Sequence, residues 1–185
     1  MPGGQETEGD EALRQRILDT YRRLPNGTNT AYYEREALAV EGVAAVGILP
    51  KARGVGTVDI IVAGPEGMPS DDLVQRVRSA MERKREIAVT VWVSPPEAVE
   101  TDVTVMVTAQ KGFAPLEVQK KTEETIRAWF SGERLGKDLL LAELGEQIFH
   151  VEGVANYHIR TPDQDLTVKE KQLPVLKTLR VEVFS

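Results

Sequence analysis

The sequence predicts an α+β protein of two small modules, each a mainly antiparallel sheet with helices packed on one face, preceded by an N-terminal helical arm. Three observations support this. Segments with apolar residues at helical spacing are interspersed with short segments rich in valine, isoleucine and threonine. A double proline, Pro95-Pro96, divides the chain. The pentapeptide VEGVA occurs at 40–44 and again at 151–155, each time between a helical pattern and a strand pattern.

The arm and the first module are predicted over residues 1–27 and 28–96. The arm begins as a polar, flexible tail and continues as an amphipathic helix that ends at Pro25-Asn26-Gly27. The elements expected after it are a helix over 31–40, strands over 44–50 and 57–63, a helix over 70–86 and a strand over 87–94. Ser70 is the expected N-cap of the second helix of this module, with Asp71 and Asp72 in its first turn.

The second module is predicted over residues 97–185. Its expected elements are a strand over 98–109, helices over 116–132 and 137–150, a strand over 154–160, a short strand over 165–168 and an alternating strand over 173–184. Starting from the second of these helices, the order helix, VEGVA, strand, loop, strand matches the first module. The repeat therefore predicts one small fold used twice.

Composition narrows the classes of function. The chain has 185 residues, of which 41% are hydrophobic, and no run of apolar residues long enough to span a membrane. It contains no cysteine, which excludes disulfides and thiolate metal sites and is typical of a reducing compartment. A net charge of -6 argues against a general nucleic-acid binder, because such proteins need a basic face. We expect neither nucleic acid nor membrane as a partner.

Glycines mark the predicted turns. Gly42 and Gly153 each follow a helical pattern, and we interpret them as helix-stop glycines in the left-handed conformation. The alternative is a glycine turn that contacts a ligand. Gly54 and Gly56 lie between two strand patterns, which favours a hairpin turn over a nucleotide-binding loop, since the latter must lead into a helix.

No catalytic, metal or cofactor site is predicted. The two histidines, His150 and His158, lack the companion spacing of a zinc site. The paired acids fit helix first turns or solvated surface, and no serine stands in a nucleophile elbow. We therefore expect no enzyme and no small-molecule substrate.

From Asp10 to Phe184 the chain resembles the baseplate J-like proteins of contractile phage tails. The segments that carry the resemblance, in order, are DEALRQRIL, NGTNTAYYEREALAVEGVAAVGILPKARGVGTVDIIVAG, PSDDLVQRVRSAMERKREIAVTVWVSPP, VETDVTVMV and LPVLKTLRVEV. The family usually has proline where this chain has Glu41 and Glu152, and often tryptophan near Glu36. The family's β-rich N-terminal region has no counterpart here, which suggests a truncated chain or a shortened prophage copy.

The resemblance implies a structural role. Family members are wedge proteins that associate with copies of themselves and with other wedge proteins in a six-fold ring around the tail hub. The implied location is the bacterial host cytoplasm during assembly and then the tail baseplate or a tail-like particle. Aromatic residues are enriched at interface hot spots, and the candidates are Tyr32, Tyr33, Trp129 and Phe130, with Trp92 also of interest.

A second hypothesis is a regulatory protein with tandem ferredoxin-like modules that binds a small molecule. It predicts a concave, partly apolar pocket with convergent polar groups near Gly42 or Gly153.

Overall fold

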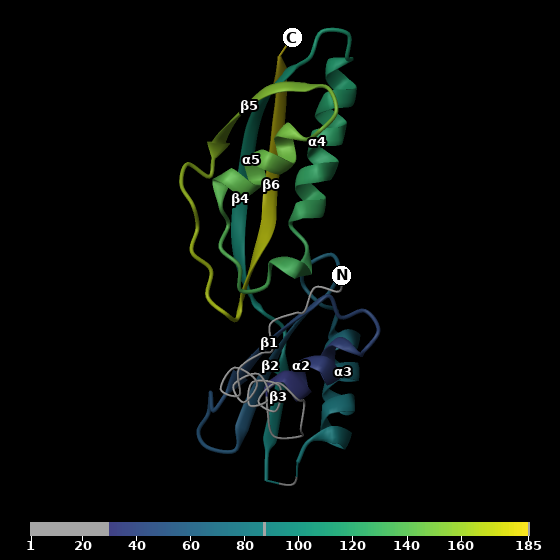
Figure 1. The fold of residues 1–185 in the computed structure, drawn as a ribbon, viewed down its shortest axis with the longest axis vertical. Coiled ribbons are helices and arrows are strands. Elements are labelled where there is room, and N and C mark those ends of the chain that lie inside the picture. Colours follow the sequence, from purple (N-terminus) through teal and green to yellow (C-terminus); the bar gives the residue numbers. More distant parts are fainter. Residues whose placement is uncertain (1–29, 87, 185) are drawn as a thin grey trace, which may run out of the picture.

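The computed structural model describes residues 30–86 and 88–184. Within them the strands form two three-stranded sheets, each with helices on one face, so the predicted α+β class is confirmed. Figure 1 shows the two sheets one above the other, with the C-terminal sheet at the top. The predicted arm helix lies outside the described residues. No helix among the described residues is long and apolar enough to cross a membrane.

The first sheet has β2 (Thr57–Ala63) in the middle, between β1 (Ala45–Pro50) and β3 (Thr90–Ser94). β1 pairs antiparallel with β2, whereas β3 pairs parallel with it, so the sheet is mixed rather than mainly antiparallel. The parallel pairing follows from α3 (Asp71–Lys84), which carries the chain back between the two strands. α3 and α2 (Thr30–Leu38) pack on the same face of this sheet.

Alternation along β2 builds the first core. Its even-numbered residues point toward the helices, and its odd-numbered residues point away from them. The buried members of this core are Tyr33, Ala37, Val58, Ile60, Val62, Leu73, Val74, Val77, Met81 and Val93. The predicted cap of α3 is confirmed, because the Ser70 hydroxyl accepts a hydrogen bond of 3.2 Å from the Leu73 backbone N–H.

The second sheet has β4 (Glu97–Ala109) in the middle, between β5 (Val154–Thr161) and β6 (Gln172–Phe184). It is also mixed, since β5 runs antiparallel and β6 parallel to β4. The predicted short strand over 165–168 is reduced to an isolated bridge between Leu139 and Leu166.

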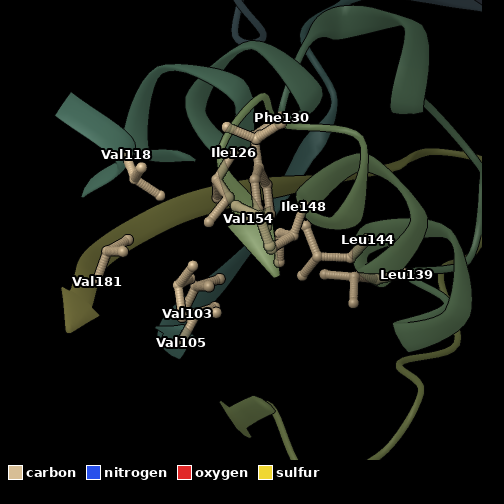
Figure 2. Packing of buried hydrophobic residues seen from close by; sticks show 12 residues of the cluster. Val103, Val105, Val118, Ile126, Phe130, Leu139, Leu144, Ile148, Val154 and Val181 are labelled. Carbon is tan, nitrogen blue, oxygen red and sulfur yellow. The ribbon is translucent and has the colours of Figure 1, made fainter. Parts of the chain in front are cut away.

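Two α-helices cover this sheet: α4 (Pro115–Trp129) and α5 (Leu141–Phe149), with the short helix η1 (Gly132–Arg134) between them. Figure 2 shows side chains of both helices converging with those of the strands. The buried members of this second core are Val103, Val105, Val107, Val118, Ile126, Phe130, Leu139, Leu144, Ile148, Val151, Val154 and Val181. Phe149, which its helical spacing placed inward, is instead 55% exposed, and Leu116, in a helix whose apolar positions are only partly periodic, is 76% exposed.

The two sheets share one spatial plan but differ in chain order. In each, a helix, a VEGV turn and a strand lead to the antiparallel neighbour of the middle strand: α2 and β1 in one, α5 and β5 in the other. In each module the middle strand leads into the other helix, α3 in the first and α4 in the second. The strand that runs parallel to the middle strand, β3 or β6, comes last in its module. The first module places the helix-turn-strand unit before the middle strand, and the second places it after. The repeat seen in the sequence is therefore a permuted one.

A bulge in β6 lets this strand contribute to two cores. Thr101 pairs with Leu176 but Asp102 pairs with Thr178, so Lys177 is an extra residue and the alternation shifts by one. After the bulge, odd-numbered residues such as Val181 face the helices. Before it, odd-numbered residues face the opposite side, toward the first sheet.

Those residues form a third core at the junction of the two modules. Leu173 and Val175 of β6 pack with Leu135 against the face of the first sheet that α2 and α3 leave free. The first sheet contributes Ala45, Leu49, Ile61 and Ala63 to this cluster. The first sheet is therefore covered on both faces over part of its area, as is usual where strands pair in parallel.

Candidate interaction surfaces

The two VEGV segments are four-residue turns with nearly identical geometry. The Val43 N–H donates to the Val40 carbonyl over 3.1 Å, and the Val154 N–H donates to the Val151 carbonyl over the same distance. The third residue of each turn is a glycine, with φ of 90° at Gly42 and 91° at Gly153. A type II β-turn requires a positive φ at its third residue, and glycine adopts this conformation without strain.

The glycines do not stop the helices directly, contrary to the helix-stop interpretation. α2 ends at Leu38 and α5 at Phe149, each one turn before its glycine. The C-cap residue of α5 is His150, whose backbone, with φ of -78° and ψ of -6°, is in the right-handed helical region. The glycine instead closes a separate turn that reverses the chain into the next strand.

The surroundings of the two turns differ. A Cβ built on Gly153 would lie 2.6 Å from Cδ1 of Phe113 and 2.9 Å from a methyl of Val118. A Cβ built on Gly42 would meet nothing closer than Arg76 Nη2 at 3.5 Å. The second turn is therefore filled by a side chain, and the first borders an open hollow of about 410 Å³.

Gly54 and Gly56 lie in the connection between β1 and β2, which pair antiparallel, and both have positive φ. The neighbouring Arg53 folds back onto the exposed face of the first sheet. Its Nε donates to Asp59 over 3.0 Å, and its guanidinium carbon lies 4.7 Å from the Trp92 ring centroid. Sequence reasoning missed this cluster, although the alternation of strand residues places Asp59 and Trp92 on the same face.

The four aromatic candidates separate into buried and accessible pairs. Tyr33 and Phe130 are 2% and 6% exposed and belong to the two cores, so they offer no surface to a partner. Tyr32 is partly exposed, and its hydroxyl donates to the Lys84 carbonyl over 3.1 Å. Trp129 is also partly exposed. The interface prediction therefore stays open for Tyr32 and Trp129 alone.

Trp129 belongs to a cluster that Arg134 organises. The guanidinium carbon of Arg134 lies 4.1 Å from the Trp129 ring centroid, within cation–π range. One terminal nitrogen donates to Glu143 over 2.8 Å and the other to the Asp138 carbonyl over 2.6 Å. These contacts tie η1 to both α4 and α5. The side chain is 12% exposed, so its main role is to hold the helices together.

Gly132 sets the approach of the two modules. A Cβ built on this residue would lie 1.9 Å from the Gly64 carbonyl oxygen and 3.1 Å from Cβ of Ala63. Its N–H donates to the Pro65 carbonyl over 3.4 Å. Only glycine allows two backbones this close, and no local pattern in the sequence marked this position.

Several charged groups form ion pairs at the surface. The pKa of Glu36 is held below its usual range, mainly by a hydrogen bond from Lys84 and next by one from Arg35. Lys84 lies at the end of α3, so this pair links the two helices of the first module. A similar bond from Lys121 to Glu152, 2.7 Å long, lowers the pKa of Glu152 and links α4 to the second VEGV turn.

A metal or catalytic site is not evident in the part of the chain that the structure describes. No group of three or more histidine, aspartate or glutamate side chains there could hold a metal ion. His150 Nδ1 lies 2.8 Å from the Glu146 carbonyl oxygen, and His158 lies on the strand β5. Several large apolar side chains are exposed at the surface and could contact a partner protein: Leu38, Val55, Met68, Trp92, Phe113, Leu116, Phe149 and Phe184.

The fold resembles that of a solved baseplate protein. A chain in the cryo-EM structure of the anti-feeding prophage baseplate matches 95% of this chain with a TM-score of 0.55 and 13% sequence identity. This chain covers 43% of that one. At this identity, the match supports the fold.

Curated relatives are found in Bacillus subtilis (strain 168). The phage-like element PBSX protein XkdT is 24% identical over 190 residues, which cover 96% of this chain. The uncharacterized protein YqbT is 36% identical over 77 residues, which cover 41% of this chain. The chain spans 55% of the length of XkdT and 22% of that of YqbT.

Two sequence families match in tandem and account for most of the chain. The baseplate J-like central domain matches residues 25–95, and the baseplate J-like protein C-terminal domain matches residues 101–182. Each match contains one of the two sheets, and the order agrees with the resemblance carried by the sequence motifs. The chain belongs to the baseplate J-like protein family.

Proposed function

We propose that this chain is a structural component of a contractile-tail baseplate, a wedge protein of a phage, a prophage or a tail-like particle. The observation that carries the proposal is the tandem match of both baseplate J-like domains over chain regions that fold as two sheets. The likeness to a chain of the anti-feeding prophage baseplate supports it. The protein acts by binding other wedge proteins and copies of itself, without catalysis. It assembles in the host cytoplasm and then resides in the baseplate.

We place the boundary between the modules at Pro95-Pro96, with 28–96 as the middle module and 97–185 as the C-terminal one. The last residue of β3 is Ser94 and the first residue of β4 is Glu97, so only the two prolines separate the strands. Such a short, stiff connection, together with the junction core, keeps the modules from moving independently. This rigidity suits a part that transmits force within a ring.

The regulatory alternative receives little support. A hollow does lie beside Gly42, as that hypothesis requires, but two of the three polar side chains that line it already have partners within the chain. Ser70 accepts from Leu73, and Arg76 binds Asp72 and the Glu41 carbonyl. A small polar ligand would find few free hydrogen-bonding groups there.

The decisive experiment is incorporation into particles. The gene is deleted from the lysogen that carries it, induced lysates are fractionated, and tails are counted by negative-stain electron microscopy. We expect intact contractile tails to disappear and to return when the tagged chain is supplied from a plasmid, with the tag in the particle fraction. Normal tails without the protein would refute the proposal.

A further inference from the structure

The loops that enter α3 and α4 occupy equivalent places in the two modules. Residues 64–70 lead from the middle strand β2 into α3, and residues 110–114 lead from β4 into α4. In the second module, Phe113 from this loop lies against the glycine of the VEGV turn, with its ring where a Cβ of Gly153 would be. The second module therefore shows what packs on a turn of this kind: an aromatic side chain.

In the first module no residue of the loop 64–70 lies within 4 Å of a Cβ built on Gly42, whose neighbours there are Leu73 and Arg76 of α3. The hollow of about 410 Å³ beside Gly42 has walls of Met68, Pro69 and Leu73. Leu73 Cδ1 would be 3.6 Å from a Cβ on Gly42, so apolar carbon lines the floor next to the turn. Since an apolar cavity of about 150 Å³ already holds a benzene molecule, an aromatic side chain has room here.

One wall of the hollow is a fixed guanidinium. Arg76 Nε donates to Asp72 over 2.9 Å, and Nη1 donates to the Glu41 carbonyl over 2.8 Å. These two bonds hold the group in place, while Nη2 lies closest to Gly42. A positioned guanidinium beside apolar carbon favours an aromatic ring, because the face of the ring attracts the cation.

The rim of the hollow is acidic. Glu66 is the one acidic residue that lines it. Glu41 and Asp71 are chain neighbours of the lining residues Gly42 and Ser70, and all three acidic residues are exposed. Asp72 is neutralised by its pair with Arg76. Acidic groups around an apolar floor complement a segment that has lysine or arginine near its aromatic residue.

We propose that the hollow beside Gly42 is a docking site for an aromatic side chain of a partner protein, presented on a basic segment. In the second module the aromatic side chain beside the turn is Phe113 of the same module. In the first module it would come from the partner protein. The site would be one of the contacts through which the proposed baseplate protein binds a neighbouring protein. The inference rests on the proposed function only for the identity of that partner.

A peptide taken from this chain provides the probe. The segment Ala109 to Leu116, AQKGFAPL, presents Phe113 beside Lys111 and fills the equivalent place in the second module. It is titrated, as a synthetic peptide, into the isotope-labelled full chain and followed by NMR. We expect progressive shifts of the Gly42 amide and of the Leu73 and Met68 methyl groups. A peptide with Phe113→Ala should lose these shifts, which separates the ring from the charge.

Two variants provide a matched comparison. Met68 and Leu38 are 43% and 44% exposed, but only Met68 lines the hollow. Met68→Lys places a long cation in the hollow and should weaken peptide binding at least tenfold. Leu38→Lys adds the same charge elsewhere and should leave it unchanged. Thermal unfolding of both variants checks that the fold is kept.

Several outcomes would overturn the proposal. They are an absence of shifts at millimolar peptide, shifts that cluster away from Gly42, or binding that survives Met68→Lys. In a further titration, unlabelled protein is added in place of the peptide. Shifts of the Gly42 amide there would show that the aromatic side chain comes from a second copy of this chain, which contradicts the proposal of a different partner protein. Incorporation into particles is scored separately, so failure of the site and failure of the baseplate role are distinguishable.

Discussion

At the scale of single residues, the glycines of the two VEGV turns show how one sequence motif acquires two environments. Both have a positive φ near 90°. The motif itself predicted the positive φ and the need for glycine, because positive φ costs other residues energy, but it placed the glycine at the helix end rather than in a separate turn. It could not predict that Phe113 packs on Gly153, since that contact joins segments far apart in the chain.

This difference makes the two glycines unequal in substitution. Gly42→Ala should lower the free energy of unfolding by about 1 kcal/mol, from backbone strain alone. Gly153→Ala adds a clash with Phe113 and Val118 and should cost about 1–3 kcal/mol more. Urea denaturation of both variants measures the difference, and equal costs would contradict the described packing.

Glu36 predicts a dependence of stability on pH. Its pKa is lowered in the folded state by hydrogen bonds from Lys84 and Arg35. The contribution to stability is therefore full above the ordinary value of 4.5 and is lost as the pH falls through the folded pKa. Glu36→Gln should reduce stability by about 1 kcal/mol or less at pH 7 and by a smaller amount at pH 3. Parallel urea titrations at the two pH values test this; an equal effect at both would refute it.

At the scale of elements, the helices and strands agree with the patterns that predicted them, and α3 is the clearest case. Its predicted cap and acidic first turn are both present, and Arg83 and Lys84 lie in its last turn. The apolar spacing was less reliable at one position, since Phe149 fits the helical stripe of α5 but is 55% exposed. The parallel neighbours, β3 and β6, were not foreseen, because alternation does not reveal strand direction.

The cap of α3 gives a prediction for this element. Ser70→Ala removes the acceptor for the Leu73 N–H and should lower the free energy of unfolding by about 1 kcal/mol. Ser79→Ala, in the exposed middle of the same helix, should be neutral or slightly stabilising, because alanine favours the helix. Thermal melts of the pair followed by circular dichroism compare them; an equal loss in both would exclude the cap as the cause.

At the scale of the whole molecule, the junction core joins two modules that the sequence suggested were separate. Ile61 and Ala63 of the first sheet pack with Leu135 and Leu173 of the second module. The candidate interaction surfaces were also only partly foreseen, because Arg134 and Gly132 act through contacts across the chain that have no local signature. Two of the four aromatic candidates, Tyr33 and Phe130, contribute to the cores instead.

The junction can be tested at Gly132. Gly132→Ala places a methyl group against the Gly64 carbonyl, so the two modules must separate locally. We expect a lower melting temperature in calorimetry and a split of one unfolding transition into two. Gly54→Ala serves as a control, because its φ of 112° brings strain but a Cβ there meets nothing within 4 Å. A single transition in Gly132→Ala would show that the close approach at Gly132 is not needed for the two modules to unfold together.

The extra residue at Lys177 has a consequence for biosynthesis. It allows β6 to cover the first sheet with Leu173 and Val175 before it completes the second core with Val181. On the ribosome, Ile61 and Ala63 emerge before those covering residues, so the nascent first module exposes an apolar sheet face until β6 is synthesised. This uncovered face is where a chaperone would bind the nascent chain before β6 covers it.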